Sequence, residues 1–209
     1  SNIKLVGTGA FSGCTALEAI NSYEVGGNYD VYYSTSDGAL LMHDMGTVYL
    51  EVFPRAKTGV YTVPEIVDVI RDKAFQYSYI DKVIISKGVS LIKTNAFYSC
   101  KAITAVEFEG DRTSTVTIED SAFRGCPTIK SIKLPAKLAE MNYVEVLGKI
   151  TNLESIEVEE GGLFYGSVNG MLTNAIEDTI LYAPASVSGT LEIPQGIQHI
   201  GPVAFAGIN

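Results

Sequence analysis

One pattern of hydrophobic positions recurs along the chain, and two adjacent copies between Val89 and Leu134 show it most completely. The first copy consists of Val89, Ile92, Ala96, Phe97, Cys100, Ile103, Val106 and Phe108. The second consists of Ile118, Ala122, Phe123, Cys126, Ile129, Ile132 and Leu134, with Thr115 in the place of Val89. From the Ala-Phe pair onward the copies align without a gap, with Phe97 and Phe123 standing 26 residues apart. A fixed period of this size predicts a protein of stacked repeats.

Further copies extend the pattern over the whole chain. Ala10-Phe11 and Ala74-Phe75 mark two of them, and Ala204-Phe205 marks a last copy that lacks its next strand. A degenerate copy has Val146-Leu147 in place of Ala-Phe. We therefore predict a single domain, residues 1–209, with repeats near residues 3–22, 65–86, 87–109, 115–135, 138–158 and 195–209.

Two longer segments, near residues 23–64 and 159–194, interrupt the repeats. In the first, the apolar runs Ala39–Met42 and Val48–Phe53 flank turn residues, which predicts a β-hairpin. The second segment repeats the first, since Asp37-Gly38 and Leu40 match Asn169-Gly170 and Leu172. At an offset of 130 residues, Pro54, Gly59, Pro64 and Phe75 recur as Pro184, Gly189, Pro194 and Phe205. A larger repeat is therefore expected above the basic one.

Within each copy, the half after the Ala-Phe pair predicts a short strand with its β-branched residues turned inward. The Ala-Phe pair is expected in a compact turn or single helical turn, and the half before it forms the opposite wall of a coil. Stacked coils would share one core built around a column of Phe side chains, at Phe11, Phe75, Phe97, Phe123 and Phe205. Three cysteines at equivalent positions, Cys14, Cys100 and Cys126, are interpreted as a column of small buried thiols, with a Cys100–Cys126 disulfide as the alternative.

Several motifs resemble those of one repeat family. These are Ala-Phe-Ser-Gly-Cys at 10–14, Ala-Phe-Arg-Gly-Cys at 122–126, Ser-Ile-Lys-Leu-Pro at 131–135 and Leu-Glu-Ile-Pro at 191–194. They are similar to the units of the BspA-like branch of the leucine-rich repeat families. The resemblance implies a β-rich, right-handed leucine-rich repeat solenoid with one short parallel strand per repeat and two inserted β-hairpins. It also implies a bacterial surface or secreted protein, because members of the family are associated with adhesion and protein binding.

The outward positions of the predicted strands form a candidate binding face. We name as the strand face the residues Asp81, Lys82, Thr104, Glu107, Lys130, Lys133, Glu154 and Glu157. Stacking predicts that Glu107, Lys133 and Glu157 are neighbours in one column, and that Thr104, Lys130 and Glu154 are neighbours in another. Opposite charges on adjacent strands stabilise a sheet. These charges therefore either solubilise and register the sheet or recognise a partner, and both interpretations stay open.

Tyrosine offers a second candidate surface. Six of the chain's twelve tyrosines crowd the first insertion and its flanks: Tyr23, Tyr29, Tyr32, Tyr33, Tyr49 and Tyr61. Tyrosine is enriched at protein interfaces because it combines a large contact area with a polar tip. The alternative is that these rings cover the small core of the hairpin itself, since a lone hairpin needs packing to be stable.

Charge and composition restrict the function. A net charge of −9 without basic clusters argues against nucleic acid and anionic membranes as partners, and no apolar run approaches the length of a membrane span. His43 and His199 have no cysteine or histidine at ligand spacing, Gly7-Thr8-Gly9 lacks the rest of a phosphate loop, and the acidic Glu157, Glu159 and Glu160 lack calcium-loop spacing. We expect no metal, no cofactor and no catalysis, and a monomer is favoured. The remaining hypotheses are an extracellular or cell-surface module that binds a protein or glycan, a structural spacer, or, least favoured, an enzyme.

Overall fold

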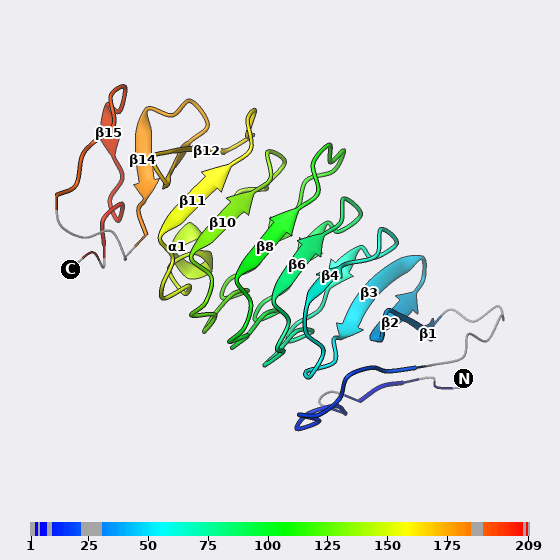
Figure 1. Ribbon diagram of the computed structural model, residues 1–209. Helices are drawn as coiled ribbons and strands as arrows, with labels where there is room; N and C mark the ends of the chain where they lie inside the picture. The colour runs from blue at the N-terminus through cyan, green and yellow to red at the C-terminus, as the bar shows by residue number, and fades with distance from the viewer. Residues whose placement is uncertain are drawn as a thin grey trace.

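The computed structural model describes residues 3, 5–7, 10–21, 31–184, 190–206 and 208. Within these residues the chain winds into coils that stack side by side along one axis, with the two termini at opposite ends of the stack (Figure 1). Tyr23, Tyr29, Thr8, Gly9 and Gly189, which entered the sequence interpretation, lie outside the described residues.

Within the described residues, fifteen strands form four sheets. The largest sheet has the order β1-β2-β3-β5-β7-β9, with bounds Val31–Ser36, Ala39–Asp44, Thr47–Val52, Val69–Ile70, Leu91–Ile92 and Thr117–Ile118. A second sheet contains β4 (Val60–Thr62), β6 (Lys82–Ile85) and β8 (Ala105–Phe108), and a third pairs β10 (Ser131–Leu134) with β11 (Ser155–Val158). The fourth has the order β12-β13-β14-β15, with bounds Tyr165–Val168, Met171–Asn174, Thr179–Tyr182 and His199–Ile200.

Each central coil contributes a strand to each of two walls. The longer strands, β6, β8, β10 and β11, are the parallel strands that the sequence predicted, and inward apolar residues alternate along them with outward polar ones. The opposite wall, expected without regular structure of its own, contains the two-residue parallel strands β5, β7 and β9. Each of these therefore adds a second strand to the repeat. Turns follow them at the Ala-Phe pairs, as predicted, and α1 (Tyr143–Val146) occupies this place in the degenerate copy.

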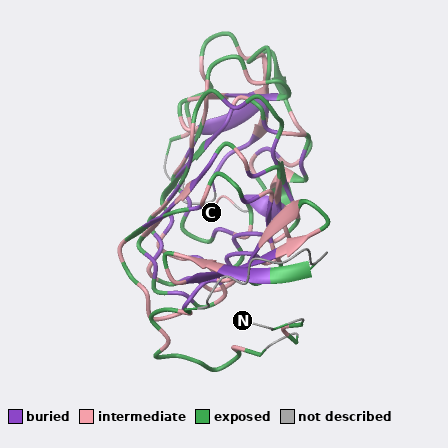
Figure 2. Ribbon diagram, turned by 90° about the vertical axis from the view of Figure 1, so that its right-hand side faces the viewer, coloured by how far each residue is buried: buried purple, intermediate pink, exposed green. Residues whose placement is uncertain are grey.

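A continuous stack of phenylalanine rings forms the centre of the core. The ring centroids of Phe75 and Phe97 lie 4.6 Å apart and those of Phe97 and Phe123 lie 5.2 Å apart, which confirms the predicted column for these three. Phe53 extends the column, with its centroid 4.7 Å from that of Phe75. The prediction missed Phe53 because residues 23–64 were treated as one insertion. The stack instead already contains β3 and Phe53, and only the preceding hairpin strands stand outside the coil pattern. Figure 2 shows the buried segments on the inside of the coil and the exposed ones at its turns.

The column prediction was wrong at both ends of the chain. Phe11 is half-buried and packs with Val6 and Ile20 against Tyr33 and other residues of the hairpin, in a cluster separate from the main core. Phe205 belongs to another small cluster around the C-terminal strands. Cys14, predicted to be buried, is exposed. The physical reason is that Phe11 and Phe205 are partly buried residues of small clusters, which cover them less than the main core covers the central rings.

The larger repeat predicted from the offset of 130 residues is visible in equivalent hydrogen bonds. The amide of Phe53 donates to the carbonyl of Ala74 at 2.8 Å, and the amide of Ala183 donates to that of Ala204 at 2.7 Å. Both insertions contain the predicted antiparallel hairpin, β2 with β3 and β13 with β14, and each is extended by a further antiparallel strand, β1 or β12. In each larger unit, the last strand of the hairpin, β3 or β14, also pairs in parallel with a strand of the solenoid wall, β5 or β15.

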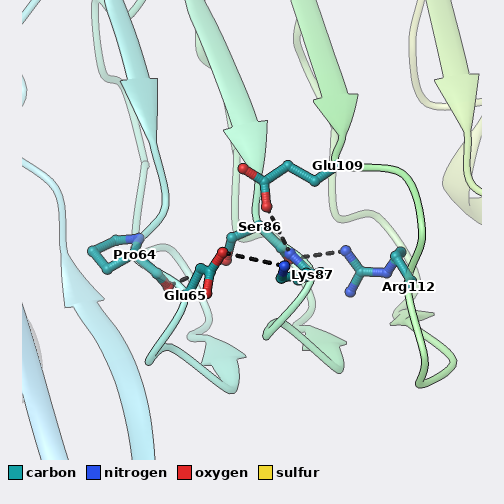
Figure 3. A network of polar contacts seen from close by, with 6 residues as sticks. All are labelled: Pro64, Glu65, Ser86, Lys87, Glu109 and Arg112. Carbon is teal, nitrogen blue, oxygen red and sulfur yellow. Dashed lines mark hydrogen bonds and ion pairs between the residues drawn. The ribbon is translucent and has the colours of Figure 1, made fainter.

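The repeat that precedes β9 has a longer loop, and a buried arginine fills it. The guanidinium of Arg112 donates from Nη1 to the carbonyl oxygen of Ser86 at 2.8 Å (Figure 3). Its Nη2 donates to the carbonyl oxygen of Val89. Burial lowers the pKa of Arg112, because desolvation disfavours its charged form. The loop also shifts the start of this copy, so that Val116 is buried where the sequence alignment placed the exposed Thr115.

Candidate functional site

The strand face is assembled by the longer wall of the solenoid. Alternation along β6, β8, β10 and β11 turns the polar residues outward while Val83, Val106, Ile132 and Ile156 are buried beneath them. The four strands lie side by side in the stack (Figure 1), although β8 and β10 belong to different sheets. The face is therefore a regular set of polar columns supported by a rigid apolar layer.

The register places the predicted charges beside one another only in part. Lys133 is the direct parallel partner of Glu157, as the column prediction required. Glu107 pairs in register with Ile84 and forms its ion pair diagonally, its Oε1 lying 2.6 Å from Nζ of Lys82. Because β8 and β10 belong to different sheets, no strand pairing joins Glu107 to the column of Lys133 and Glu157. For Lys133, no ion pair is found within the described part of the chain.

The second predicted column divides in a similar way. Lys130 Nζ lies 2.6 Å from Oε1 of Glu154, as expected from the stacking of their repeats. Both side chains are more than half exposed, at 69% and 53%, so solvent screening leaves this pair a small contribution to stability. Thr104 instead donates its hydroxyl to the carbonyl oxygen of Asp81 at 3.0 Å.

Asp81 and Thr104 hold successive coils together. The carboxylate of Asp81 accepts a hydrogen bond from the amide of Gly59 at 2.7 Å, and the carbonyl of Asp81 accepts from the amide of Thr104 at 2.8 Å. These two positions stabilise the stacking of three neighbouring coils. The exposed charged residues of the strand face are Asp81, Glu107, Lys130, Lys133, Glu154 and Glu157, and the last four lie on β10 and β11 and their flanks.

The two buried cysteines form hydrogen bonds between successive coils. Cys100 Sγ donates to the carbonyl oxygen of Phe75 and Cys126 Sγ to that of Phe97, both at 2.9 Å. The hydrogen bond between Cys126 and Cys100 and the burial of Cys126 raise the pKa of the Cys126 thiol. Both cysteines are free, so the alternative disulfide is absent between them. Each thiol links its coil to the preceding one, which explains the repetition of this residue in the motif.

The histidines and acidic residues noted in the sequence occupy separate places. The ring of His43 stacks on Tyr32 with centroids 4.2 Å apart, and its Nε2 lies 2.7 Å from the hydroxyl of Ser34. Glu159 accepts a hydrogen bond from the amide of Ala136 at 3.3 Å. Among the described residues, no three His, Cys, Asp or Glu side chains come together as a metal site. No helix in the described part of the chain has the length and apolar character needed to cross a membrane.

The tyrosines of the first insertion mostly support the packing interpretation. Tyr33 is buried in the hairpin cluster, and its hydroxyl accepts a hydrogen bond from the amide of Val6 at 3.1 Å. Tyr61 is buried in the main core, with its centroid 4.8 Å from that of Phe53. Tyr49 is half-buried beneath the guanidinium of Arg71. Among the four members that the structure describes, Tyr32 is the most exposed, at 39%.

A pocket of about 430 Å³ separates the N-terminal segment from the first coils. It is lined by apolar residues such as Phe11 and Val52 and by the charged pair Glu51 and Arg71, whose Oε2 and Nε lie 3.2 Å apart. Burial raises the pKa of Glu51, and the neighbouring Arg71 opposes that shift. The pocket reflects the incomplete packing of the first repeat against the stack.

Sequence analysis missed a third set of exposed side chains, on the turns that follow the Phe column. Tyr77 and Tyr98 meet there with ring centroids 5.6 Å apart, and the guanidinium of Arg55 lies 4.9 Å from the centroid of Tyr77. Aligning the residues two positions after each Phe would have placed Arg55, Tyr77 and Ser99 in one column. That signal was overlooked because Phe53 was not recognised as a member of the repeat.

Comparison with known proteins agrees with this architecture. A family model described as the BspA type leucine rich repeat region matches residues 48–168 in six copies. The coil architecture defines a leucine-rich repeat solenoid, and the match, which covers more than half of the chain, places this protein in the BspA-type leucine-rich repeat family. The matched region begins at Val48, within β3, and this strand leads directly to Phe53, which stacks on Phe75. No curated protein matches the chain.

Two solved structures share the fold. The pneumococcal vaccine antigen PcpA is 15% identical, with a TM-score of 0.58 over 90% of this chain. The chain spans 62% of that antigen's structure. A leucine-rich repeat protein from Bacteroides capillosus is 21% identical, with a TM-score of 0.54, and the match covers 63% of this chain and 99% of that one. At these identities the likeness concerns the fold alone.

Proposed function

We propose that this chain is a non-catalytic binding module of an extracellular or cell-surface bacterial protein, and that its strand face contacts a protein or glycan. The observation that carries the proposal is the row of exposed charges on β10 and β11, held on a rigid layer and only partly neutralised by neighbours. Lys133 is exposed beside Glu157 without a salt bridge in the described chain, which leaves its ammonium group available to a partner. Repeat solenoids use such extended surfaces for binding.

Family membership supports the surface location and the adhesive role. The related pneumococcal protein is described as a vaccine antigen, which fits a molecule displayed to the host, and this chain shares its fold. A binding module needs a stable surface and few moving parts. The described residues supply this through coil-to-coil hydrogen bonds such as that of Thr104 with Asp81.

The test is a binding screen of the whole chain against arrays of host matrix proteins and glycans, followed by variants of the strand face. For a partner found in this way, Lys133→Glu should weaken binding about tenfold or more, because charge reversal at a contact both removes an attraction and adds a repulsion. Lys87→Glu is the control, since Lys87 carries the same charge on the exposed turn that follows β6, where it pairs with Glu65 at 3.5 Å. Equal effects of the two reversals would contradict a role for the strand face.

The alternative function is a spacer that holds another domain away from the cell surface. The regular stacking of coils favours this possibility, because a solenoid is extended and stiff. A panel without any binding partner, together with loss of parent-protein activity when the number of coils is reduced, would favour the spacer.

A further inference from the structure

The turns after the phenylalanine column present aromatic and basic side chains on one edge of the solenoid. We define the turn-edge patch as Arg55, Tyr77, Tyr79, Tyr98, Lys101 and Arg124. Backbone hydrogen bonds connect its turns: the amide of Tyr79 donates to Arg55, that of Tyr77 to Tyr98, and that of Ser99 to Arg124. This edge lies where the arrows of β6, β8 and β10 begin (Figure 1). The patch is therefore continuous across four successive coils.

Taken together, the second halves of these turns have a charge opposite to that of the whole chain. The four residues after each phenylalanine of the column, 54–57, 76–79, 98–101 and 124–127, contain no Asp or Glu, in a chain with 24 acidic and 15 basic residues. They contain the cations Arg55, Lys57, Lys101 and Arg124. Asp37 of the hairpin neutralises Lys57, since its Oδ1 lies 2.6 Å from Nζ. Within the described residues, no carboxylate forms an ion pair with the other three.

Two acidic residues close in sequence to these turns are paired with other cations. Glu51 pairs with Arg71 at 3.2 Å, and Asp72 pairs with Lys73 at 3.4 Å. Within the described residues, both polar contacts of the Arg55 side chain are with Tyr77. Its Nε donates to the carbonyl oxygen of Tyr77 at 3.4 Å, and its guanidinium stacks on the Tyr77 ring. Stacking of this kind restricts the side chain, and the Nη groups of Arg55 form no hydrogen bond with the described part of the chain. A fixed guanidinium of this sort is prepared for a carboxylate.

Tyr77 occupies a backbone position that favours glycine. The residue two positions after the repeat's Phe is Gly13 in the first copy and Gly125 in another, with φ of +79° and +75°, and Tyr77 has φ of +59° in the same place. A bulky residue in the left-handed region is unusual and strained. Tyr77 is 40% exposed and Tyr79 is 50% exposed. Tyr77 therefore combines a left-handed backbone with a side chain that stays partly exposed beside Arg55 and Tyr98, and we attribute its place to a surface role.

From these observations we propose that the turn-edge patch binds an acidic segment of a partner protein. Tyr and Arg are the residues that dominate the energy of protein interfaces, and the local positive charge on an otherwise negative molecule selects acidic partners and orients them. Arg55 covers one face of Tyr77 and Tyr98 meets its edge, so the proposed contacts are made by the charged groups of the patch. This site is separate from the strand face, so either can fail without the other.

The experiment measures fluorescence anisotropy of a labelled peptide of ten glutamates, titrated with the whole chain at low salt. Binding should weaken about fivefold or more in Arg55→Gln and in Arg124→Gln, and less than about twofold in Lys133→Gln, which removes the same charge from the strand face. A labelled peptide of ten lysines and an oligomer of glucuronic acid serve as comparison probes. No binding of the glutamate peptide, an equal loss in Lys133→Gln, or preference for the acidic sugar would overturn the proposal.

Two substitutions at Tyr77 separate binding from folding. Tyr77→Gly relieves the left-handed strain, so its unfolding midpoint in denaturant should equal or exceed that of the wild type while peptide binding weakens, because Arg55 loses its stacking partner. Tyr77→Phe keeps the ring and should bind like the wild type. A lower unfolding midpoint with unchanged binding in Tyr77→Gly would assign Tyr77 a structural role and contradict the proposal.

Discussion

Two five-residue segments of this chain differ in sequence at a single position and lie in opposite environments. Residues 10–14 read Ala-Phe-Ser-Gly-Cys and residues 122–126 read Ala-Phe-Arg-Gly-Cys. In both, the glycine has a positive φ, +79° at Gly13 and +75° at Gly125, so the local turn is the same. Yet Cys126 is fully buried and Cys14 is exposed.

The difference teaches that the repeat motif determines the conformation of a coil, and that its neighbours determine its burial. Phe123 and Cys126 lie between coils that supply a stacked ring at 5.2 Å and a carbonyl acceptor at 2.9 Å. Phe11 of the first segment packs instead with the residues of the hairpin cluster. Nearest-neighbour interfaces carry much of the stability of repeat proteins, so the same motif contributes less where one interface is missing.

The largest contrast is expected in thiol reactivity. Cys14 should react with a thiol reagent in the native protein, whereas Cys100 and Cys126 should react only when the stack opens, with rates lower by about 10³-fold or more, because exposure of core groups costs a large share of the unfolding free energy. Labelling of single-cysteine variants followed by mass spectrometry measures the rates. Rapid native labelling of Cys126 would contradict its place in the core.

A smaller contrast is expected between two phenylalanines. Phe97→Ala should lower the free energy of unfolding by about 3–5 kcal/mol, because it removes a fully buried ring stacked on both sides. Phe11→Ala should cost only about 1 kcal/mol, since its ring is half-buried. Urea titrations followed by circular dichroism provide both values. If the two losses were equal, the first copy would be as well packed as the central ones.

Next in size is the effect of the buried arginine in the long loop. Arg112→Ala should lower the free energy of unfolding by about 2 kcal/mol, because the carbonyls of Ser86 and Val89 would lose their donor inside the protein. Arg124→Ala is the control, as Arg124 is exposed and should change stability by less than about 0.5 kcal/mol. The same denaturant titration applies. A neutral Arg112→Ala would show that the loop is not held by this side chain.

The smallest effect is expected from the exposed ion pair on the strand face. Lys130→Ala should change the free energy of unfolding by about 0.5 kcal/mol or less, since its pair with Glu154 is screened by water and salt. Measurement at low and high salt should remove even this difference. A loss comparable to that of Arg112→Ala would mean that the charges of this face serve the stack and would weaken its assignment to binding.

Much of this architecture was accessible from the hydrophobic pattern. The Ala-Phe spacing predicted the turns, the phenylalanine column at Phe75, Phe97 and Phe123, and the hairpin after residue 38, because turn chemistry and strand alternation are local properties. The degenerate copy was also placed correctly, with Val146 and Leu147 buried. The place of Phe53 in the phenylalanine column was not predicted, because its copy has Val52 where the motif has alanine.

The candidate sites were less accessible. The repeat alignment predicted the pairing of Lys130 with Glu154. It did not predict the ion pair of Glu107 with Lys82, because the alignment does not show that β8 and β10 belong to different sheets. The turn-edge patch depends on side chains from four coils that are separated by about a repeat length in sequence. To predict this patch from the sequence, the position of each of the four coils in the stack would have to be known.

By itself, the sequence determined the repeat, its turns and the identity of the residues that face inward, because each depends on spacing within one coil. Only the tertiary structure decided which copies are enclosed, which charges meet and where basic and aromatic side chains gather. The physical reason is that burial and ion pairing depend on the next coil, and a coil at the end of a stack carries the same motif without having that neighbour.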